Sequence, residues 1–127
     1  IEAAVQRMHA ATGQPPLLLA HSMGGLAVRA WLRGAGGDAR VHGALTVGTP
    51  HHGTWLARFG FAANTRQMRW HDPWLAALAA HEPAERYRRF TCFYGHCDNI
   101  VFPCSTATLP GAEVFTTKAE SKCALWK

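Results

Sequence analysis

Residues 17–25 read Leu-Leu-Leu-Ala-His-Ser-Met-Gly-Gly, an apolar run followed by a serine that has small residues two positions before and two positions after it. A short continuous apolar run suits a strand that is covered on both faces of a parallel sheet. Helical spacing resumes at Leu26, Trp31 and Leu32 and ends at the glycines that follow. The stretch therefore predicts a buried strand, a sharp turn centred on Ser22, and a helix.

The rest of the chain continues this alternation of strands and helices. Further elements are expected as a helix over 1–12, strands over 41–47 and 90–94, a weak strand over 113–116, and two short helices within 54–83, one before Pro73 and one over 74–80. Strands that alternate with helices build a parallel sheet with helices on both faces. The predicted class is α/β, with about three strands of a larger sheet.

Composition and charge exclude several classes of protein. The 127 residues suit one domain, and an apolar content of 48% excludes a disordered tail. No apolar run approaches the roughly 18 residues that span a bilayer. The 13 basic and 8 acidic residues give a net charge of +5, but the arginines are scattered. The cluster of Arg86, Arg88 and Arg89 is interpreted as a solvated helix end or strand approach, so no nucleic-acid partner is predicted.

The cysteines do not predict a metal site. Cys92, Cys97, Cys104 and Cys123 are separated by 5, 7 and 19 positions, so no CxxC pair is present. A bridge between Cys97 and Cys104 and separate buried thiols are equally open. Neither a metal nor another cofactor is predicted.

The turn around Ser22 places a hydroxyl where acyl-transfer chemistry needs one. Such a turn crowds the positions two before and two after its centre, which here hold Ala20 and Gly24. Unpaired N–H groups at a helix N-terminus favour developing negative charge, and the N–H of Met23 is the expected oxyanion donor. The alternative is a serine that merely caps an ordinary helix.

Three segments resemble the lipase and esterase branch of the α/β-hydrolases, in particular bacterial triacylglycerol-lipase-like proteins. They are Ala20–Gly25 (AHSMGG), Gly48–Thr54 (GTPHHGT) and Cys97–Pro103 (CDNIVFP), and the resemblance covers about residues 1–112. It implies the C-terminal half of that fold and a serine hydrolase acting on esters or lipids, with possible contact with a lipid interface and no cofactor. Ser22 would be the nucleophile and Asp98 the triad acid; His51 and His52 would shape the pocket wall.

The sequence contains further candidates for the triad acid and for the substrate wall. Asp38, Asp72, Glu82 and Glu85 are rival acids, but each falls in a helix-exit loop or in the helical segment 54–83. That segment is either a lid or substrate wall, or ordinary core helices. His21 is expected to point to the opposite side of the turn from Ser22, in a packing or hydrogen-bonding role.

One departure from the family pattern affects the whole hypothesis. The family's base is a histidine that follows the acid, yet no histidine follows Asp98. All three lysines lie in residues 118–127, so the tail 114–127 differs in composition from the rest. We therefore expect residues 1–127 to be a fragment, with a second oxyanion donor upstream of Ile1 and an altered C-terminal end. The alternatives are a catalytically inactive binding module of the same fold, or a related acyltransferase or thioesterase.

Overall fold

The central element is a parallel sheet of four strands in the order β1-β2-β3-β4. The computed structural model describes residues 1–34, 39–59, 66–95 and 101–117. The strands are β1 (Leu17–His21), β2 (Gly43–Val47), β3 (Phe90–Gly95) and β4 (Glu113–Thr117). The predicted α/β class with a parallel sheet is confirmed, and the weak strand at the C-terminal end proves to be a full member of the sheet.

The helices begin and end where local chemistry favours it. They are α1 (Glu2–Thr12), α2 (Met23–Gly34), η2 (Trp55–Phe59), α4 (Pro73–Ala80), α5 (Ala84–Tyr87) and η3 (Cys104–Ala107). Gly13 ends α1 with a left-handed φ of 67°, which glycine adopts without strain. Asp72 accepts a hydrogen bond from the N–H of Trp74 and starts α4, with Pro73 in the first turn. Of the segment where we expected a helix before Pro73, the described residues show the 3₁₀ turn η2 and helical residues at 66–67, while residues 60–65 lie outside the described ranges.

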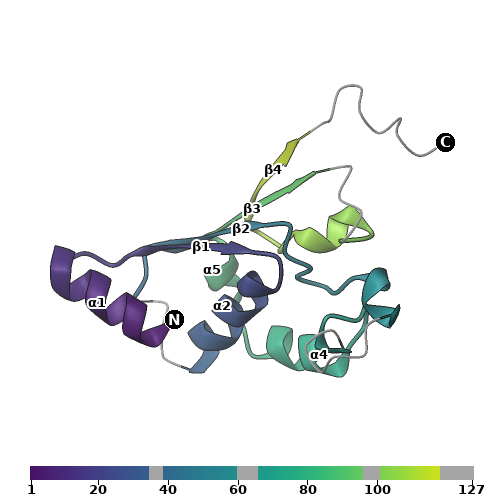
Figure 1. Cartoon of the computed structure of the whole chain (residues 1–127), viewed down its shortest axis with the longest axis horizontal. Coiled ribbons are helices and arrows are strands. Elements are labelled where there is room, and N and C mark those ends of the chain that lie inside the picture. The colour runs from purple at the N-terminus through teal and green to yellow at the C-terminus, as the bar shows by residue number, and fades with distance from the viewer. Residues whose placement is uncertain (35–38, 60–65, 96–100, 118–127) are drawn as a thin grey trace.

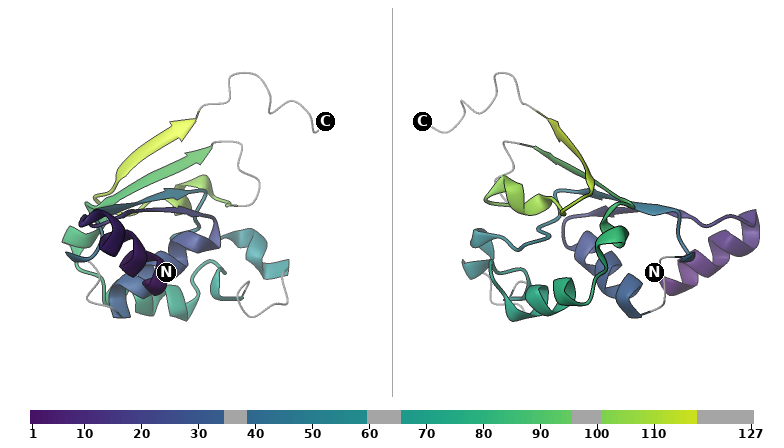
Figure 2. Two further views of the ribbon diagram at one scale, coloured as in Figure 1. Left: turned by 60° about the vertical axis from the view of Figure 1, so that its left-hand side comes forward. Right: turned by 180° about the vertical axis from the view of Figure 1, so that it is seen from behind.

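The helices and the sheet form two layers, which Figure 1 shows with α1, α2, α4 and α5 on one side of the strands. The views in Figure 2 agree. The core lies between these layers; its members include Val5, Val28, Leu32, Ala44, Phe90 and Cys92. Among the described residues, helices cover this face of the sheet alone, which differs from the predicted arrangement with helices on both faces.

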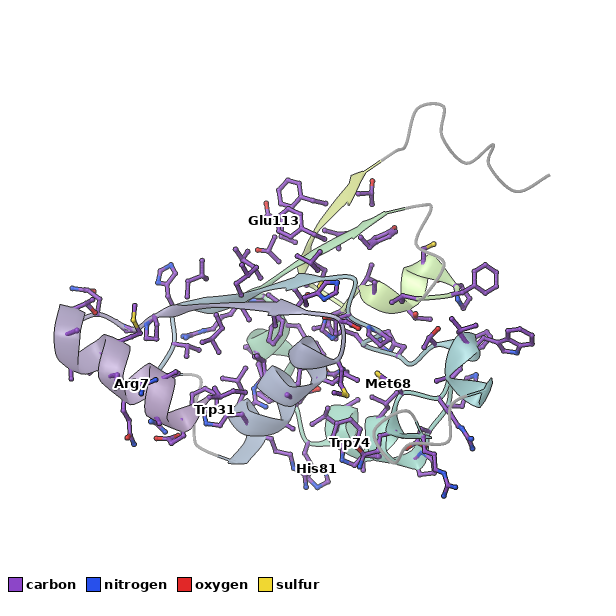
Figure 3. All side chains as sticks on the ribbon, in the orientation of Figure 1. Arg7, Trp31, Met68, Trp74, His81 and Glu113 are labelled. Carbon is purple, nitrogen blue, oxygen red and sulfur yellow. The ribbon has the colours of Figure 1, made fainter. Side chains whose placement is uncertain are left out.

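The opposite face of the sheet is apolar and exposed, and we call it the open face. It carries Leu17, Leu19, Leu45, Val47, Phe93 and Phe115, as the strand register shows. Leu17 is 53% exposed and Leu19 is 75% exposed, so the expectation that the run 17–20 is buried on both sides is wrong for the part of the chain described. The rings of Phe93 and Phe115 stack at 5.1 Å between centroids. Glu113 projects on the same side (Figure 3).

Two further expectations can be compared with the structure. Arg86 is buried, unlike Arg88 and Arg89, so the arginine cluster is not uniformly solvated. The described helices are all too short or too polar to cross a bilayer.

Candidate active site

Ser22 lies in a strained turn between β1 and α2. Its φ is 52°, a left-handed conformation that costs an L-residue with a side chain about 1–2 kcal/mol. Its N–H donates to the carbonyl of Val47 at 2.9 Å, and its own carbonyl accepts from the N–H of Gly25 at 3.2 Å. An N-capping residue normally has extended backbone angles instead. The geometry therefore favours a strained strand-to-helix turn over an ordinary cap.

The closest packing in this turn is at Gly25 and not at Gly24. A Cβ added at Gly24 would lie 3.7 Å from the Cβ of Ala20, an ordinary contact. A Cβ at Gly25 would lie 2.4–2.9 Å from three side-chain atoms of Thr49, which no relaxed structure tolerates. Sequence reasoning singled out Gly24 and missed Gly25, although the second glycine of the pair was visible in the same string.

Met23 provides both a backbone donor and an apolar surface next to Ser22. It is the first residue of α2, where N–H groups lack partners within the helix. Its side chain is 41% exposed. Met23, Met68 and Trp74 contribute to a hollow of about 160 Å³, which Leu26, Ala27 and Gln67 complete. Figure 3 labels Met68 and Trp74 on the helical side of the sheet. The hollow could receive a small apolar group.

His51 is a buried member of the loop that follows β2. It is 1% exposed, its Nε2 lies 3.1 Å from the Oγ1 of Thr46, and its ring meets that of Phe90 edge-on. Burial, with help from the nearby Arg29 charge, lowers the pKa of His51 well below its usual value. These contacts pack His51 into the interior of the loop, and its role in a pocket wall stays a prediction.

His52 reaches the surface beside His51. Its N–H donates to the carbonyl of Thr106 at 3.1 Å, which ties the loop to η3. Partial burial and Arg29 lower the pKa of its imidazole. Both histidines line a second hollow of about 360 Å³, together with Trp70, His71, Asp72, Leu75, Ala76 and Ala79. The loop thus forms a wall between the sheet edge and α4.

A buried charged cluster lies beneath this loop. The side chain of Arg29 on α2 is 1% exposed and that of Glu82 is 0% exposed. Arg29 donates to Glu82 through Nε at 3.1 and 3.2 Å and through Nη2 at 2.6 Å. Its Nη1 donates to the carbonyl of His51 at 2.8 Å, and the hydroxyl of Tyr87 donates to Glu82 at 2.7 Å. Burial and the neighbouring Glu82 carboxylate raise the pKa of Tyr87 to about 12.

Sequence analysis missed Arg29, although one signal was present. Arg29 lies three residues after Leu26 and three before Leu32, so it falls on the apolar face of its helix. A charge at such a position indicates a buried partner, because an unpaired buried charge is very costly.

The structure places three of the rival acids. Asp72 caps α4, Glu82 pairs with Arg29, and Glu85 is exposed in the first turn of α5. Asp38 and Asp98 lie outside the described residues. The structure therefore brings Ser22, Met23 and the loop of His51 together but does not place the predicted acid.

His21 and the cysteines complete the set of predicted residues. His21 is exposed at the end of β1 and lies on the open face with Leu17 and Leu19. Across the described ranges, no group of three or more His, Cys, Asp or Glu side chains is arranged to hold a metal ion. Cys92 is a buried free thiol, and Cys97 lies outside the described residues.

Comparisons with known proteins identify the fold. No protein-family model and no curated protein sequence matches the chain. Among solved structures, the mature form of the Bacillus licheniformis lipase BlEst2 matches with a TM-score of 0.70 and 16% identity, over 91% of this chain and 61% of that one. The propeptide form of BlEst2 matches with a TM-score of 0.69 and 17% identity, over 91% of this chain and 34% of that one. This chain spans less than two thirds of the mature lipase, and the likeness establishes a lipase-like fold.

Proposed function

We propose that the protein is a serine hydrolase of the α/β-hydrolase fold that cleaves carboxylic esters or lipids, with Ser22 as its nucleophile. The observation that carries the proposal is the left-handed backbone of Ser22 at the carboxyl end of β1, directly before α2. A strained strand-to-helix turn of this kind exposes a serine hydroxyl at the edge of the sheet. A lipase-like fold supports the same reading.

The proposed chemistry assigns one task to each residue. The Oγ of Ser22 attacks the acyl carbon, and its proton passes to the histidine of a Ser-Asp-His triad as the carbonyl oxygen becomes an oxyanion. No histidine lies between Asp98 and Lys127. The N–H of Met23, at the positive end of α2, stabilises that oxyanion. The hollow beside Met23 accepts an apolar part of the substrate. Asp98 is proposed to orient the base. Among the rival acids that the structure describes, Asp72 and Glu82 have other partners and Glu85 is exposed.

A fluorophosphonate probe tests the nucleophile directly, because it forms a covalent bond with activated serines. We expect peptide mapping to find the label on Ser22. We expect Ser22→Ala to abolish this labelling and to lower kcat for ester hydrolysis by roughly 10³-fold or more. Ser105→Ala is the matched control, since Ser105 is an exposed serine in η3. Equal labelling of native and denatured protein would refute the assignment.

The acid is tested by a pair of isosteric substitutions. Asp98→Asn should reduce kcat on the order of 10⁴-fold, because an amide favours the wrong tautomer of the base. Asp72→Asn is the control, because asparagine caps a helix about as well as aspartate does. A silent Asp98→Asn beside a crippling Asp72→Asn would reverse the choice of acid.

A second candidate function is an inactive binding module of the same fold. It is favoured by one observation, the absence of histidine after Asp98. Such a module would bind an ester or lipid analogue while Ser22 stays unreactive toward the probe. Probe labelling of Ser22 would exclude it, and substrate profiling would then separate a hydrolase from an acyltransferase or thioesterase.

A further inference from the structure

The buried cluster of Arg29, Glu82 and Tyr87 joins α2 to a segment that lies about fifty residues later in the sequence. Arg29 comes from α2, Glu82 from the connection between α4 and α5, and Tyr87 from α5. The guanidinium lies 5.9 Å from the ring centroid of Tyr87, over its face. Glu82 uses both carboxylate oxygens toward Arg29 and one toward Tyr87. Each charged group in the cluster is therefore well satisfied.

Stability alone does not account for such a cluster. Removing two charges from water costs several kcal/mol per ion, and apolar residues of similar volume often stabilise a protein as well or better. The distinguishing feature is the bond that an apolar replacement would lose, from Nη1 of Arg29 to the carbonyl of His51. This bond links the helix that begins after Ser22 to the loop that follows β2.

That loop needs support from outside itself. Within the described residues, the Oγ1 of Thr49 and the Nδ1 of His51 are buried and have no hydrogen-bond partner. Buried polar atoms without partners cost about 1–3 kcal/mol each, which opposes the conformation that the loop adopts. Contacts from outside hold the loop there. Among them, Nη1 of Arg29 donates to the carbonyl of His51, Thr46 contacts the imidazole of His51, and the carbonyl of Thr106 accepts from the N–H of His52.

The loop also touches the turn around Ser22. The side chain of Thr49 fills the space that a Cβ at Gly25 would need, three residues after Ser22. A displacement of the loop would therefore disturb the packing of α2 three residues after the proposed nucleophile. Arg29 on α2 also holds the carbonyl of His51, so the loop and the Ser22 turn are both attached to the same helix.

We infer that Arg29 is a positioning residue, which holds residues 49–52 against the helix that carries the Ser22 turn and so fixes the wall of the substrate site. Its effect on substrate rests on the proposed function. Its effect on the loop does not, and the two can be measured separately.

The decisive variant is Arg29→Met/Glu82→Leu/Tyr87→Phe, which replaces the cluster by apolar residues of similar size. We expect it to fold, with amide hydrogen exchange at His51, His52 and Gly53 at least about tenfold faster and the Ser22 amide unchanged. For ester hydrolysis we expect KM to rise about tenfold while kcat changes less than threefold, as a lost wall contact would do. Arg40→Met is the matched control, because Arg40 forms an ion pair with Glu2 near the surface.

The outcomes are distinguishable. Unchanged loop exchange in a folded triple variant would overturn the inference, whatever the kinetics show. If the wild-type protein hydrolyses no ester, the proposed function fails, but faster loop exchange would still support the positioning of the loop by Arg29. If the triple variant does not fold, Arg29→Lys serves instead, since one ammonium group cannot reproduce the fork that reaches both Glu82 and His51. Wild-type loop exchange and wild-type KM in Arg29→Lys would then overturn the inference.

Discussion

At the scale of the residue, the left-handed backbone of Ser22 lowers the stability of the fold. A left-handed φ of 52° is unfavourable for serine and for alanine but not for glycine. We therefore expect Ser22→Gly to raise the free energy of unfolding by about 1 kcal/mol relative to Ser22→Ala, while both variants lose ester hydrolysis. Urea unfolding of the two variants measures the difference.

The matched comparison for Ser22→Gly is Ser105→Gly against Ser105→Ala, at a position without a positive φ. There the glycine variant should be the less stable one. If Ser22→Gly proves less stable than Ser22→Ala, the turn is not strained in solution.

Buried His51 makes stability depend on pH. Burial lowers the pKa of His51 in the folded protein below the value of 6.5 that it has when unfolded. Below pH 6.5 the unfolded chain therefore binds a proton at His51 that the folded protein does not bind. The free energy of unfolding is highest above pH 6.5 and decreases as the pH falls below it. For one proton the slope approaches about 1.4 kcal/mol per pH unit. We expect His51→Gln to reduce this slope between pH 7 and pH 5, as measured by urea unfolding.

His52 contributes a smaller slope of the same sign, because its pKa is also lowered. The control is His42→Gln on the surface. Equal slopes in the wild type and in His51→Gln would show that the imidazole of His51 is hydrated in solution.

At the scale of the element, α2 and the loop after β2 fit together without spare room. Gly25→Ala places a methyl group 2.4–2.9 Å from Thr49 atoms, so the loop must move. Overpacking of this kind typically costs about 1–3 kcal/mol. We expect Gly25→Ala to lower the unfolding free energy by that amount, and Gly24→Ala to have little effect. Thr49→Ala should partly restore Gly25→Ala, because it removes the two nearest atoms, and thermal unfolding of the four variants tests this.

The elements that the sequence predicts well are those with local signals. The apolar runs, Gly13 and the Asp72–Pro73 start are local, and the corresponding strands and helices are where they were expected. The segment 54–72 has no clear period; its described part contains the 3₁₀ turn η2 and helical residues at 66–67, and residues 60–65 lie outside the described ranges. The site divides in the same way. The Ser22 turn follows from neighbouring residues, whereas Arg29 and Glu82 are 53 residues apart and meet only in the folded chain.

At the scale of the whole molecule, the open face exposes apolar side chains that favour association with other chains. Leu17 and Leu19 lie on β1, which is an edge strand of the described sheet. Exposed apolar edge strands promote association with other chains. We expect Leu19→Lys to reduce self-association, as measured by light scattering, with less than about 0.5 kcal/mol change in stability because this side chain is 75% exposed. Leu18→Lys, on the core face of the same strand, should instead unfold the protein.

The backbone of Ser22 has not left the sheet. Its N–H still bonds to Val47 at the end of β2, and the N–H of Gly48 bonds in turn to Phe93 on β3. These hydrogen bonds anchor the proposed nucleophile to β2 and, through Gly48, to β3. If Ser22 is the nucleophile, the substrate and the base must therefore approach a serine whose position the sheet already fixes.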